Sequence, residues 1–468
     1  MAERFDVVVV GSGAGGGVVA GELAQAGRSV LLLETGPHKT AADFTRWEAK
    51  AAHDMWWPIR FALIDGGAGG VVGLVGGRCV GGSTTINTKV ALRAHAKDLA
   101  KWKEASGLDI DLMPNYERVE QRLGVRERTD WSKSVRKVEP AFAKLGAPLE
   151  AVRSYTDANC VNLGACLQGC PTNGGKSTQN TYIADAHRAG LLDLRPDSNV
   201  ERVVIESGEA KGVEYTGPDG TLTRVDAGVV VVAAGTLNSP QLLMRSGVTL
   251  PLVGRNLGFH PARLVYGLFD EPQDAHMVYP ITSHSMAHQH DDDGGFVIEA
   301  TTIQDPIGFT TTMEDENGPM YGQPLVDAAK KFRNWIGLLA MSNDDNNGRV
   351  SIGENGEDVY EASFTEAEKT RFAGALEFTR DVLREAGATQ LVWSGLITTH
   401  MQGSNRMGTD PDRSVLDENQ QVWDVRRLYV GDGSVMPRTL SVNPSLTIMA
   451  LADRLALHLD EDTNGYLS

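Results

Sequence analysis

The chain opens with a hydrophobic pattern that predicts a strand, a helix and a second strand. Residues 6–10 form a β-branched run without polar alternation, as in a strand buried on both faces of a parallel sheet. Val19, Leu23 and Ala26 then recur at helical spacing, and Gly27 follows as a residue suited to a helix C-terminus. A second apolar run at 29–33 ends at Glu34. This order predicts a βαβ unit.

Further along, the pattern changes character. Apolar runs predict additional strands near the first unit, whereas alternating apolar and polar positions between about 260 and 400 predict antiparallel strands. These predicted strands lie at 199–205, 211–215, 228–233, 263–269, 295–302 and 308–312. The predicted helices lie at 97–102, 116–123, 239–246, 365–386 and 447–459.

The pattern predicts an α/β protein in which a Rossmann-like nucleotide-binding domain is discontinuous. Its expected segments are 1–95, 190–255 and 400–468. Residues 96–189 are expected to form a connecting cap segment with a cysteine loop. Residues 256–399 are expected to form an inserted substrate-binding domain, an antiparallel sheet covered by helices.

Composition excludes several classes of partner. The chain has 468 residues, 41% of them hydrophobic, and 44 Lys and Arg against 61 Asp and Glu, for a net charge of −17. An acidic surface repels phosphate backbones and anionic headgroups, so we expect no nucleic acid partner. Without a long apolar run we expect no direct membrane insertion. The polar start predicts no signal peptide and hence a cytoplasmic location, with export bound to a signal-bearing partner left open.

The turn after the first strand carries a dinucleotide-binding pattern. Gly11, Gly13 and Gly16 are spaced as in GxGxxG, with Ser12 and Ala14 between them. Such glycines permit a tight turn, close approach of a pyrophosphate, and helix packing on the strand. Glu34 stands where a carboxylate accepts hydrogen bonds from ribose hydroxyls. FAD and NAD share this pattern, so the remainder of the chain must distinguish them.

Four further blocks accompany the glycine turn. They are Gly77-Arg-Cys-Val-Gly-Gly-Ser-Thr-Thr-Ile-Asn87, Ala234-Gly-Thr-Leu-Asn-Ser-Pro-Gln-Leu-Leu243, Val253-Gly-Arg-Asn-Leu-Gly-Phe-His-Pro261 and the tail at 400–459. With these five blocks the chain resembles the glucose–methanol–choline (GMC) oxidoreductase family. The blocks follow the family's order, whereas residues 260–400 match only in general character.

The resemblance implies bound FAD. Some relatives link FAD to a histidine at a place that matches Ile86, so a non-covalent flavin is expected here. The expected FAD contacts are Gly11, Ser12, Gly13, Ala14, Gly16, Glu34, Arg78, Gly81, Gly82, Ser83, Thr84, Asn87, Val200, Ala234, Gly235, Asp432, Gly433, Pro444, Ser445 and Thr447.

His400 and Asn443 are the expected catalytic pair. Alcohol oxidation removes a proton from oxygen while hydride leaves the carbinol carbon, and histidine titrates near neutrality, which suits the proton step. In the relatives that this chain resembles, a histidine at the His400 position is paired with a second His or an Asn. Because an amide does not titrate, His400 is expected to take the proton while Asn443 orients the hydroxyl.

Three cysteines form a separate group with two open interpretations. Cys160, Cys166 and Cys170 lie within eleven residues, and Pro171 follows the last. Three thiolates suit a [3Fe–4S] cluster, as in sugar dehydrogenases of the GMC family, whereas zinc usually takes four ligands. The alternative is three free or partly disulfide-bonded thiols that pack a loop.

Two aromatic or histidine-rich segments have simpler interpretations. His284, His288 and His290 with residues 291–293 are expected to form a solvated polar loop rather than a metal site. Trp56 and Trp57 are expected either to line a pocket or to pack in the core.

These features predict an FAD-dependent enzyme that oxidises an alcohol, with a sugar, glycoside or other polyol as the expected substrate. Aliphatic or aromatic alcohols are the alternative, and a lyase that keeps FAD without redox turnover is another. The expected electron acceptor is oxygen or a quinone-type compound, with a partner electron-transfer subunit as a third arrangement.

Overall fold

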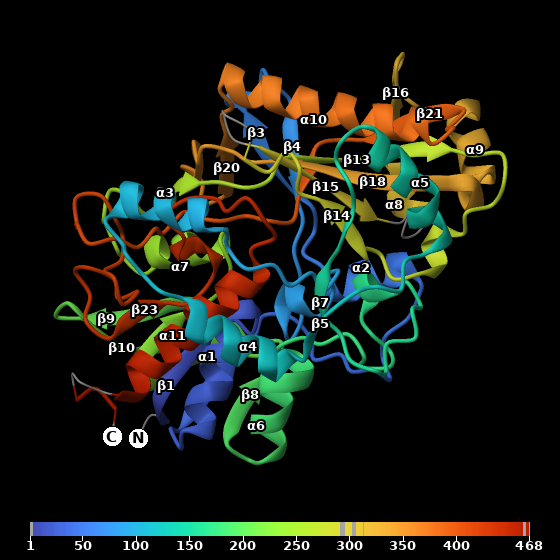
Figure 1. Cartoon of the computed structure of the whole chain (residues 1–468). Helices are drawn as coiled ribbons and strands as arrows, with labels where there is room; N and C mark the ends of the chain where they lie inside the picture. Colours follow the sequence, from blue (N-terminus) through green and yellow to red (C-terminus); the bar gives the residue numbers. More distant parts are fainter. Residues whose placement is uncertain (1–2, 291–294, 302–305, 312, 462–464, 468) are drawn as a thin grey trace.

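The computed structural model describes residues 3–290, 295–301, 306–311, 313–461 and 465–467. Two β-sheets organise this part of the chain, one beside α1 and α11 and the other beneath α10 (Figure 1). No helix in these ranges combines the length and the apolar character needed to span a bilayer.

The first sheet is built around the predicted βαβ unit. Its order is β8-β2-β1-β11-β10-β9, and β23 also pairs with β11. The bounds are β1 Arg4–Val10, β2 Val30–Leu33, β8 Leu192–Arg195, β9 Asn199–Glu206, β10 Glu209–Thr216, β11 Leu222–Val232 and β23 Leu428–Val430. The long strand β11 pairs with antiparallel β10 through its first half and with parallel β1 and β23 through its second half. The carboxyl ends of the parallel strands therefore gather sequence blocks that lie far apart in the chain.

Helices cover this sheet with apolar side chains at the spacing seen in the sequence. α1 (Ala14–Gln25) buries Val18, Val19 and Leu23, and α11 (Ser445–Glu461) lies against it. Burial of a branched or aliphatic side chain contributes about 1.5–3 kcal/mol each, which fixes the helices on the sheet. The other helices of this half are α3 Ala96–Ser106, α4 Met113–Leu123, α6 Ala184–Arg188 and α7 Asn238–Arg245.

The second sheet is larger and mostly antiparallel. Its order is β12-β19-β20-β3-β4-β22-β13-β18-β15-β14-β6, with β21, β16 and β17 paired alongside. The bounds are β3 Arg60–Ile64, β4 Val71–Leu74, β6 Glu150–Ala151, β12 Arg255–Leu257, β13 Ala262–Leu268, β14 Ser283–Ser285, β15 Phe296–Thr301, β16 Met313–Asp315, β17 Gly318–Pro319, β18 Trp335–Ser342, β19 Gly348–Ile352, β20 Asp358–Ala362, β21 Gln390–Ser394 and β22 Ile397–Thr398. The strands β5 Val125–Glu127 and β7 Arg153–Tyr155 form a separate ribbon.

Helices close one face of the second sheet and leave the other for the site. α10 (Glu366–Glu385) and α5 (Lys133–Lys144) pack Val382 and Phe142 against Ile298 and Leu338. The remaining helices are α2 Glu48–Met55, α8 Pro306–Thr311 and α9 Gln323–Lys330.

The two sheets do not follow the expected domain segments at every point. β3 and β4 fall within residues 1–95, which the sequence assigns to the nucleotide-binding domain, yet they pair in the second sheet. The boundaries at 96–189, 190–255 and 256–399 stay a prediction.

Two local predictions are wrong. The expected strand at 308–312 lies in helix α8 as far as residue 311, and residue 312 is outside the described ranges. The segment of His284, His288 and His290 is not a solvated loop, because His284 is 4% exposed in strand β14 and His288 stacks on Phe296. Polar side chains in β14 hid this strand from a pattern based on apolar positions. Residues 291–293 lie outside the described residues.

Candidate active site

A cavity of about 1720 Å³ is lined by residues of both sheets. Gly11 and Glu34 lie along it in the first sheet, and Leu264 and Met341 line it from the second. Of the predicted site residues, those lining it are Gly11, Ser12, Gly13, Ala14, Glu34, Arg78, Gly82, Ser83, Thr84, Asn87, Val200, Ala234, Gly235, His400, Asp432, Gly433, Asn443, Pro444 and Ser445. Residues distant in sequence thus share one cavity.

The glycine turn after β1 is shaped as its sequence predicts. Gly11 has φ +96°, and a Cβ there would lie 2.3 Å from the Ala233 carbonyl oxygen. Gly16 does not line the cavity but lets α1 pack on β1, since a Cβ would lie 1.9 Å from Gly11 O. At Gly13 a Cβ would meet nothing within 4 Å. The backbone at Gly13 therefore faces open cavity at the start of a helix, where a phosphate group is stabilised.

Glu34 holds the glycine turn from the end of β2. Its Oε2 accepts hydrogen bonds from Ser12 N–H at 3.0 Å and Ser12 Oγ at 2.7 Å, and its Oε1 accepts from Gly36 N–H at 2.8 Å. Burial raises the pKa of this carboxyl, and the hydrogen bonds oppose the rise. Glu34 also lines the cavity, so its hydrogen bonds to Ser12 and Gly36 are compatible with the predicted contact to a ribose.

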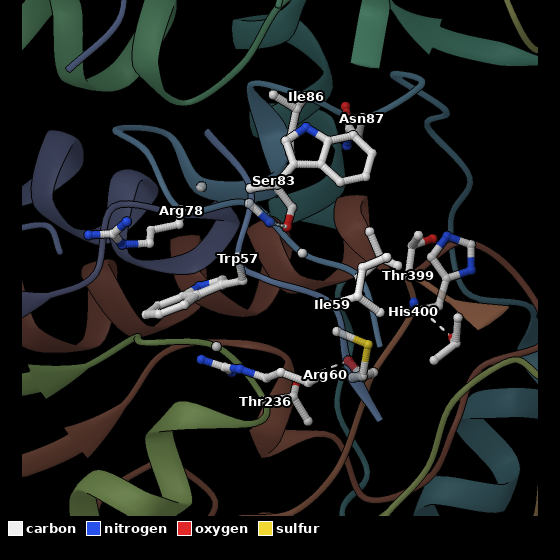
Figure 2. Close-up of a pocket in the computed structure, with 18 of the residues that line it drawn as sticks. Trp57, Ile59, Arg60, Arg78, Ser83, Ile86, Asn87, Thr236, Thr399 and His400 are labelled. Carbon is white, nitrogen blue, oxygen red and sulfur yellow. Dashed lines mark hydrogen bonds between the residues drawn. The ribbon is translucent and has the colours of Figure 1, made fainter. Parts of the chain in front are cut away.

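The loop at 77–87 is fixed by its own hydroxyl groups. Ser83 Oγ accepts a hydrogen bond from Gly77 N–H at 2.9 Å, and Thr84 Oγ1 donates to Gly81 O at 2.6 Å. Gly81 has φ +88° and supports the turn without lining the cavity. Figure 2 shows Ser83, Ile86 and Asn87 along the same stretch of the pocket. Ile86 is 5% exposed and carries no group that could form a bond to a flavin.

Tyr155 joins this loop to the last helix and was not among the predicted residues. Its hydroxyl accepts a hydrogen bond from Asn87 Nδ2 at 2.5 Å and lies 3.2 Å from Ser445 Oγ. No motif surrounds Tyr155 in the sequence, so its position depends on the ribbon of β5 and β7.

Two tryptophans, which the sequence predicts either to line a pocket or to pack in the core, line the cavity. Trp56 and Trp57 both face it, and the Arg60 guanidinium lies 4.3 Å from the centre of the Trp57 ring. Figure 2 shows Arg60 extended below the Trp57 ring and Arg78 above it.

The tail places the start of α11 beside the cavity. Asp432 Oδ2 accepts from Gly235 N–H at 2.8 Å, and its Oδ1 accepts from Ser434 N–H at 2.8 Å. Asp432 thereby connects the two blocks at 234–243 and 400–459. Thr447 does not line the cavity, because its Oγ1 lies 2.7 Å from the Tyr116 hydroxyl.

The predicted catalytic pair meets on the cavity wall near the start of α11. His400 follows β22, and Asn443 precedes α11. Asn443 Nδ2 lies 3.4 Å from His400 Nε2. The backbone N–H of His400 donates to Thr398 Oγ1 at 3.2 Å, which fixes the residue at the end of its strand.

A second histidine, His260, fixes the proton positions on His400. His260 Nε2 lies 2.6 Å from the Leu440 carbonyl oxygen, which can only accept, so the proton of neutral His260 is on Nε2. Its Nδ1 then accepts from His400 Nδ1–H at 3.0 Å. The lone pair of His400 is therefore on Nε2, the atom beside Asn443. Burial lowers the pKa of both rings, and His260 lowers that of His400 further, so both are neutral near pH 7.

His260 was missed as a site residue although its block was recognised. It lies between β12 and β13 and was quoted only as part of Val253-Gly-Arg-Asn-Leu-Gly-Phe-His-Pro261. The signal available in the sequence was a histidine before a proline at the boundary of the second sheet. The sequence could not predict the contact of His260 with the Leu440 carbonyl, which lies 180 residues away in the chain.

The cysteine loop does not have the geometry of a metal site. Among the described residues, no group of three or more His, Cys, Asp or Glu side chains is arranged to hold a metal ion. Cys160 Sγ accepts from Arg128 Nη1 at 3.4 Å, and Cys170 Sγ accepts from Gly175 N–H at 3.1 Å. Burial raises the pKa of Cys166 to about 12. The described residues therefore give no support for the [3Fe–4S] cluster, and all three cysteines are free thiols.

Solved structures with this fold include two oxidases. The chain superposes on pyridoxine 4-oxidase from Mesorbium loti with a TM-score of 0.76 at 22% identity, covering 97% of this chain and 99% of that one. It superposes on a formate oxidase with a TM-score of 0.77 at 14% identity, covering 99% of each chain. At these identities the likeness establishes the fold alone.

Curated relatives agree with the fold. The chain is 29% identical to a long-chain-alcohol oxidase of Arabidopsis thaliana, covering 96% of this chain and 66% of that protein. It is 30% identical to an uncharacterised GMC-type oxidoreductase of Mycobacterium tuberculosis, covering 96% of this chain and 75% of that protein. The chain thus spans about two thirds of the length of the first relative. Residues 5–262 match the N-terminal and residues 326–452 the C-terminal domain of the GMC oxidoreductases, and the chain belongs to this family of enzymes.

Proposed function

We propose that this enzyme uses non-covalently bound FAD to oxidise an alcohol. The observation that carries the proposal is the chain of hydrogen bonds from Leu440 O through His260 to His400, which leaves a lone pair on His400 Nε2. This atom belongs to a neutral base on the wall of a large cavity and lies beside an amide that can orient a hydroxyl. Such an arrangement suits removal of a hydroxyl proton.

The cavity fits an extended dinucleotide. Open space borders Gly13 and Gly235, where a Cβ would meet nothing within 4 Å, so ligand atoms can approach the backbone there. The glycine turn would hold the pyrophosphate, Glu34 and Val200 the adenosine part, and the 77–87 loop with Gly433 and Ser445 the flavin end. When bound, FAD supplies the acceptor for the hydride of the substrate. The N-terminus of α11 would stabilise negative charge at that end of the cavity.

The protein's own part of the reaction is the proton. Asn443 Nδ2 and His400 Nε2 would hold the substrate hydroxyl between them, and the hydroxyl proton would move to Nε2 as hydride leaves the carbinol carbon. The products are a carbonyl compound, a proton on His400 and the carbinol hydrogen, which passes to the acceptor as hydride with its two electrons. The resulting imidazolium keeps its Nδ1–H hydrogen bond to His260, so the ring stays in place.

The pH profile tests the state of His400. The base must be neutral to work, and burial and His260 hold its pKa well below the ordinary value. Activity is therefore lost only when acid protonates the ring. We expect kcat/KM to hold at pH values below the ordinary imidazole pKa of about 6.5 and to fall at more acidic pH. An acid limb centred above that value would contradict the assignment.

The role of His260 has its own test. The His260→Phe variant removes both ring nitrogens, leaving His400 Nδ1–H without its acceptor and freeing the ring to take either tautomer. One buried unsatisfied group costs about 1–3 kcal/mol, so we expect kcat/KM to fall about 10- to 100-fold. The acid limb should move to higher pH, because His260 lowers the pKa of His400. His260→Gln, which retains an acceptor, should recover part of the loss, whereas unchanged profiles in both variants would exclude the role.

The substrate side of the cavity favours an alcohol with an apolar body. Ala262, Leu264, Ile281, Leu339 and Met341 line this side. Ile59, Phe61 and Val71 also line the cavity and are 45–54% exposed. These three side chains therefore form an apolar entrance to the cavity. The relatives include long-chain-alcohol oxidases and, at 24% identity, the pyridoxine 4-oxidase of Microbacterium luteolum. Aliphatic or aromatic alcohols therefore have more support than the sugar or polyol expected from the sequence.

Oxygen is the proposed electron acceptor. Long-chain-alcohol oxidases and a pyridoxine 4-oxidase are among the curated relatives, and the described residues of the cysteine loop show no metal site that could relay electrons toward a partner subunit. We expect oxygen uptake when a primary alcohol is added to the aerobic enzyme. Turnover only with a quinone-type dye would instead favour the dehydrogenase alternative.

Acid precipitation tests whether the flavin is covalently attached. Ile86 and its neighbours Ala51, Met55 and Cys79 form a buried apolar cluster, with Cys79 held as a thiol because burial raises its pKa to about 12. We expect acid precipitation to release all yellow flavin into the supernatant. Flavin retained in the washed pellet would show a covalent bond.

A further inference from the structure

Glu299 is a buried carboxyl group on the cavity wall for which the reaction above has no use. It lies in β15, is 1% exposed and lines the cavity. Neither of its carboxyl oxygens has a hydrogen-bond partner within the described ranges. Buried carboxyl groups are normally paired, so an unpaired one in a cavity marks a candidate binding group.

The surroundings of Glu299 offer little compensation from the protein. Its cross-strand partners are His284 in β14 and Leu339 in β18, and Leu264 in β13 continues the same row. Cross-strand partners point to one face of a sheet, and Leu264 and Leu339 line the cavity with Glu299. The Nδ1 atom of buried His284 also lacks a partner among the described residues. The carboxyl group thus interrupts an apolar wall.

Glu299 lies near Asn443 of the predicted catalytic pair. Burial raises the pKa of Glu299 to about 7, and the Asn443 side chain, which approaches the carboxyl as a weak hydrogen-bond donor, opposes this rise. The Asn443 Oδ1 atom is itself without a hydrogen-bond partner in the described structure. Two unpaired polar groups therefore face one region of the cavity, next to the nitrogen that would take the substrate proton.

Burial without a partner is costly, and this indicates that the missing partner comes from a ligand. An unsatisfied buried polar group costs about 1–3 kcal/mol, and more if charged. A leucine at position 299 would continue the wall of Leu264 and Leu339 without this penalty. A carboxyl group at this place is useful if the substrate brings a donor to it.

We propose that Glu299 is a substrate-binding residue that accepts a hydrogen bond from an O–H or N–H donor elsewhere on the alcohol whose carbinol lies between His400 and Asn443. This proposal rests on alcohol oxidation as the function. It narrows the substrate class to amphiphilic alcohols: an apolar body fits the row of Leu264 and Leu339, and a second hydroxyl or a protonated amine meets the carboxyl group. Plain alkanols leave Glu299 unpaired.

The test compares alcohols of equal length that differ in the second group. Linear primary alcohols of two to six carbons are assayed as the plain alkanol, the terminal diol and the terminal amino alcohol. The ratio of kcat/KM between donor-bearing and plain alcohols is measured in the natural enzyme, Glu299→Gln and Glu299→Leu. Leu339→Val, on the neighbouring strand, is the matched control that alters the wall but keeps the carboxyl.

The proposal predicts a ratio of about 10- to 100-fold at the chain length that spans the two groups. In Glu299→Leu the ratio should fall to about one, while Leu339→Val should keep it. Glu299→Gln distinguishes the donors, because a neutral amide still accepts from a hydroxyl but loses the attraction for an ammonium group. Preference for the amino alcohol alone, lost in Glu299→Gln, assigns the cation.

Two results would overturn the proposal while leaving alcohol oxidation intact. One is a natural enzyme that shows no preference for any donor-bearing alcohol at any length. The other is an equal loss of kcat for all alcohols in Glu299→Leu, which would mean that Glu299 only positions Asn443. If no alcohol is oxidised at all, the proposed function is wrong, but the role of Glu299 can still be tested by calorimetric binding of hexylamine and 1,6-hexanediol. Binding that is lost in Glu299→Leu supports Glu299 as a ligand-binding group. Equal binding in the natural protein and Glu299→Leu excludes that role.

Discussion

The His400→Ala enzyme is expected to keep its flavin and to lose about 10²–10⁴-fold in kcat, the usual contribution of a general base. The reason is local: only His400 Nε2 carries a lone pair fixed by the hydrogen bonds through His260 to Leu440. Asn443 cannot replace it, because an amide does not accept a proton near neutral pH. Steady-state turnover with the best alcohol and the flavin-to-protein ratio are measured on the same preparation.

A matched histidine controls for the substitution itself. His458 lies in α11 near Tyr429, outside the cavity lining, and His458→Ala should change neither turnover nor flavin content by more than a small factor. His400→Gln should be as inactive as His400→Ala, since glutamine fills space without basicity. Full turnover in either His400 variant would refute the proposed proton transfer.

The second large effect is expected at Gly13, where Gly13→Val should weaken FAD binding by about tenfold or more, as overpacking at a close contact does. The added side chain points into the cavity where nothing lies within 4 Å of its Cβ, so the fold itself tolerates it. The readout is the flavin absorbance of the purified protein together with its unfolding temperature after removal of FAD.

The control for Gly13 is a glycine two residues further on. A Cβ on Gly15 would lie 1.6 Å from the Gly431 carbonyl oxygen, so Gly15→Ala must displace backbone. We expect Gly15→Ala to lower the unfolding temperature of the flavin-free protein, and Gly13→Val to leave it close to that of the natural chain. A Gly13→Val protein that binds FAD normally would place the pyrophosphate elsewhere.

Sequence patterns were sufficient wherever a local rule determined the structure. The apolar run at 6–10, the glycine spacing and Glu34 gave the βαβ unit because each residue acts on its immediate neighbours. His400 and Asn443 lie side by side, as the sequence predicts. Each is in a short segment next to a regular element, which fixes its position. Their assigned roles, and those of the FAD contacts, stay predictions.

Long-range partners explain what the sequence could not provide. Glu299 stands in a strand of the second sheet, and only the register of β15 with β18 shows that it faces the cavity. His260 needed the Leu440 carbonyl, and the buried polar residues of β14 needed a neighbouring strand. The expected strand at 308–312 fails for a similar reason: a short β-favouring pattern does not decide between strand and helix. The cysteine spacing suggested a cluster because spacing alone does not report where the thiols point.

The most direct test of alcohol oxidation is to add alcohols to the purified flavoprotein without oxygen and record its visible spectrum. We predict that the absorbance of oxidised flavin at about 450 nm bleaches with an apolar or amphiphilic alcohol, and that His400→Ala protein with the same flavin content does not bleach on that time scale. Flavin that stays oxidised with every alcohol of the panel would contradict alcohol oxidation and favour the lyase alternative, in which FAD is kept without redox turnover.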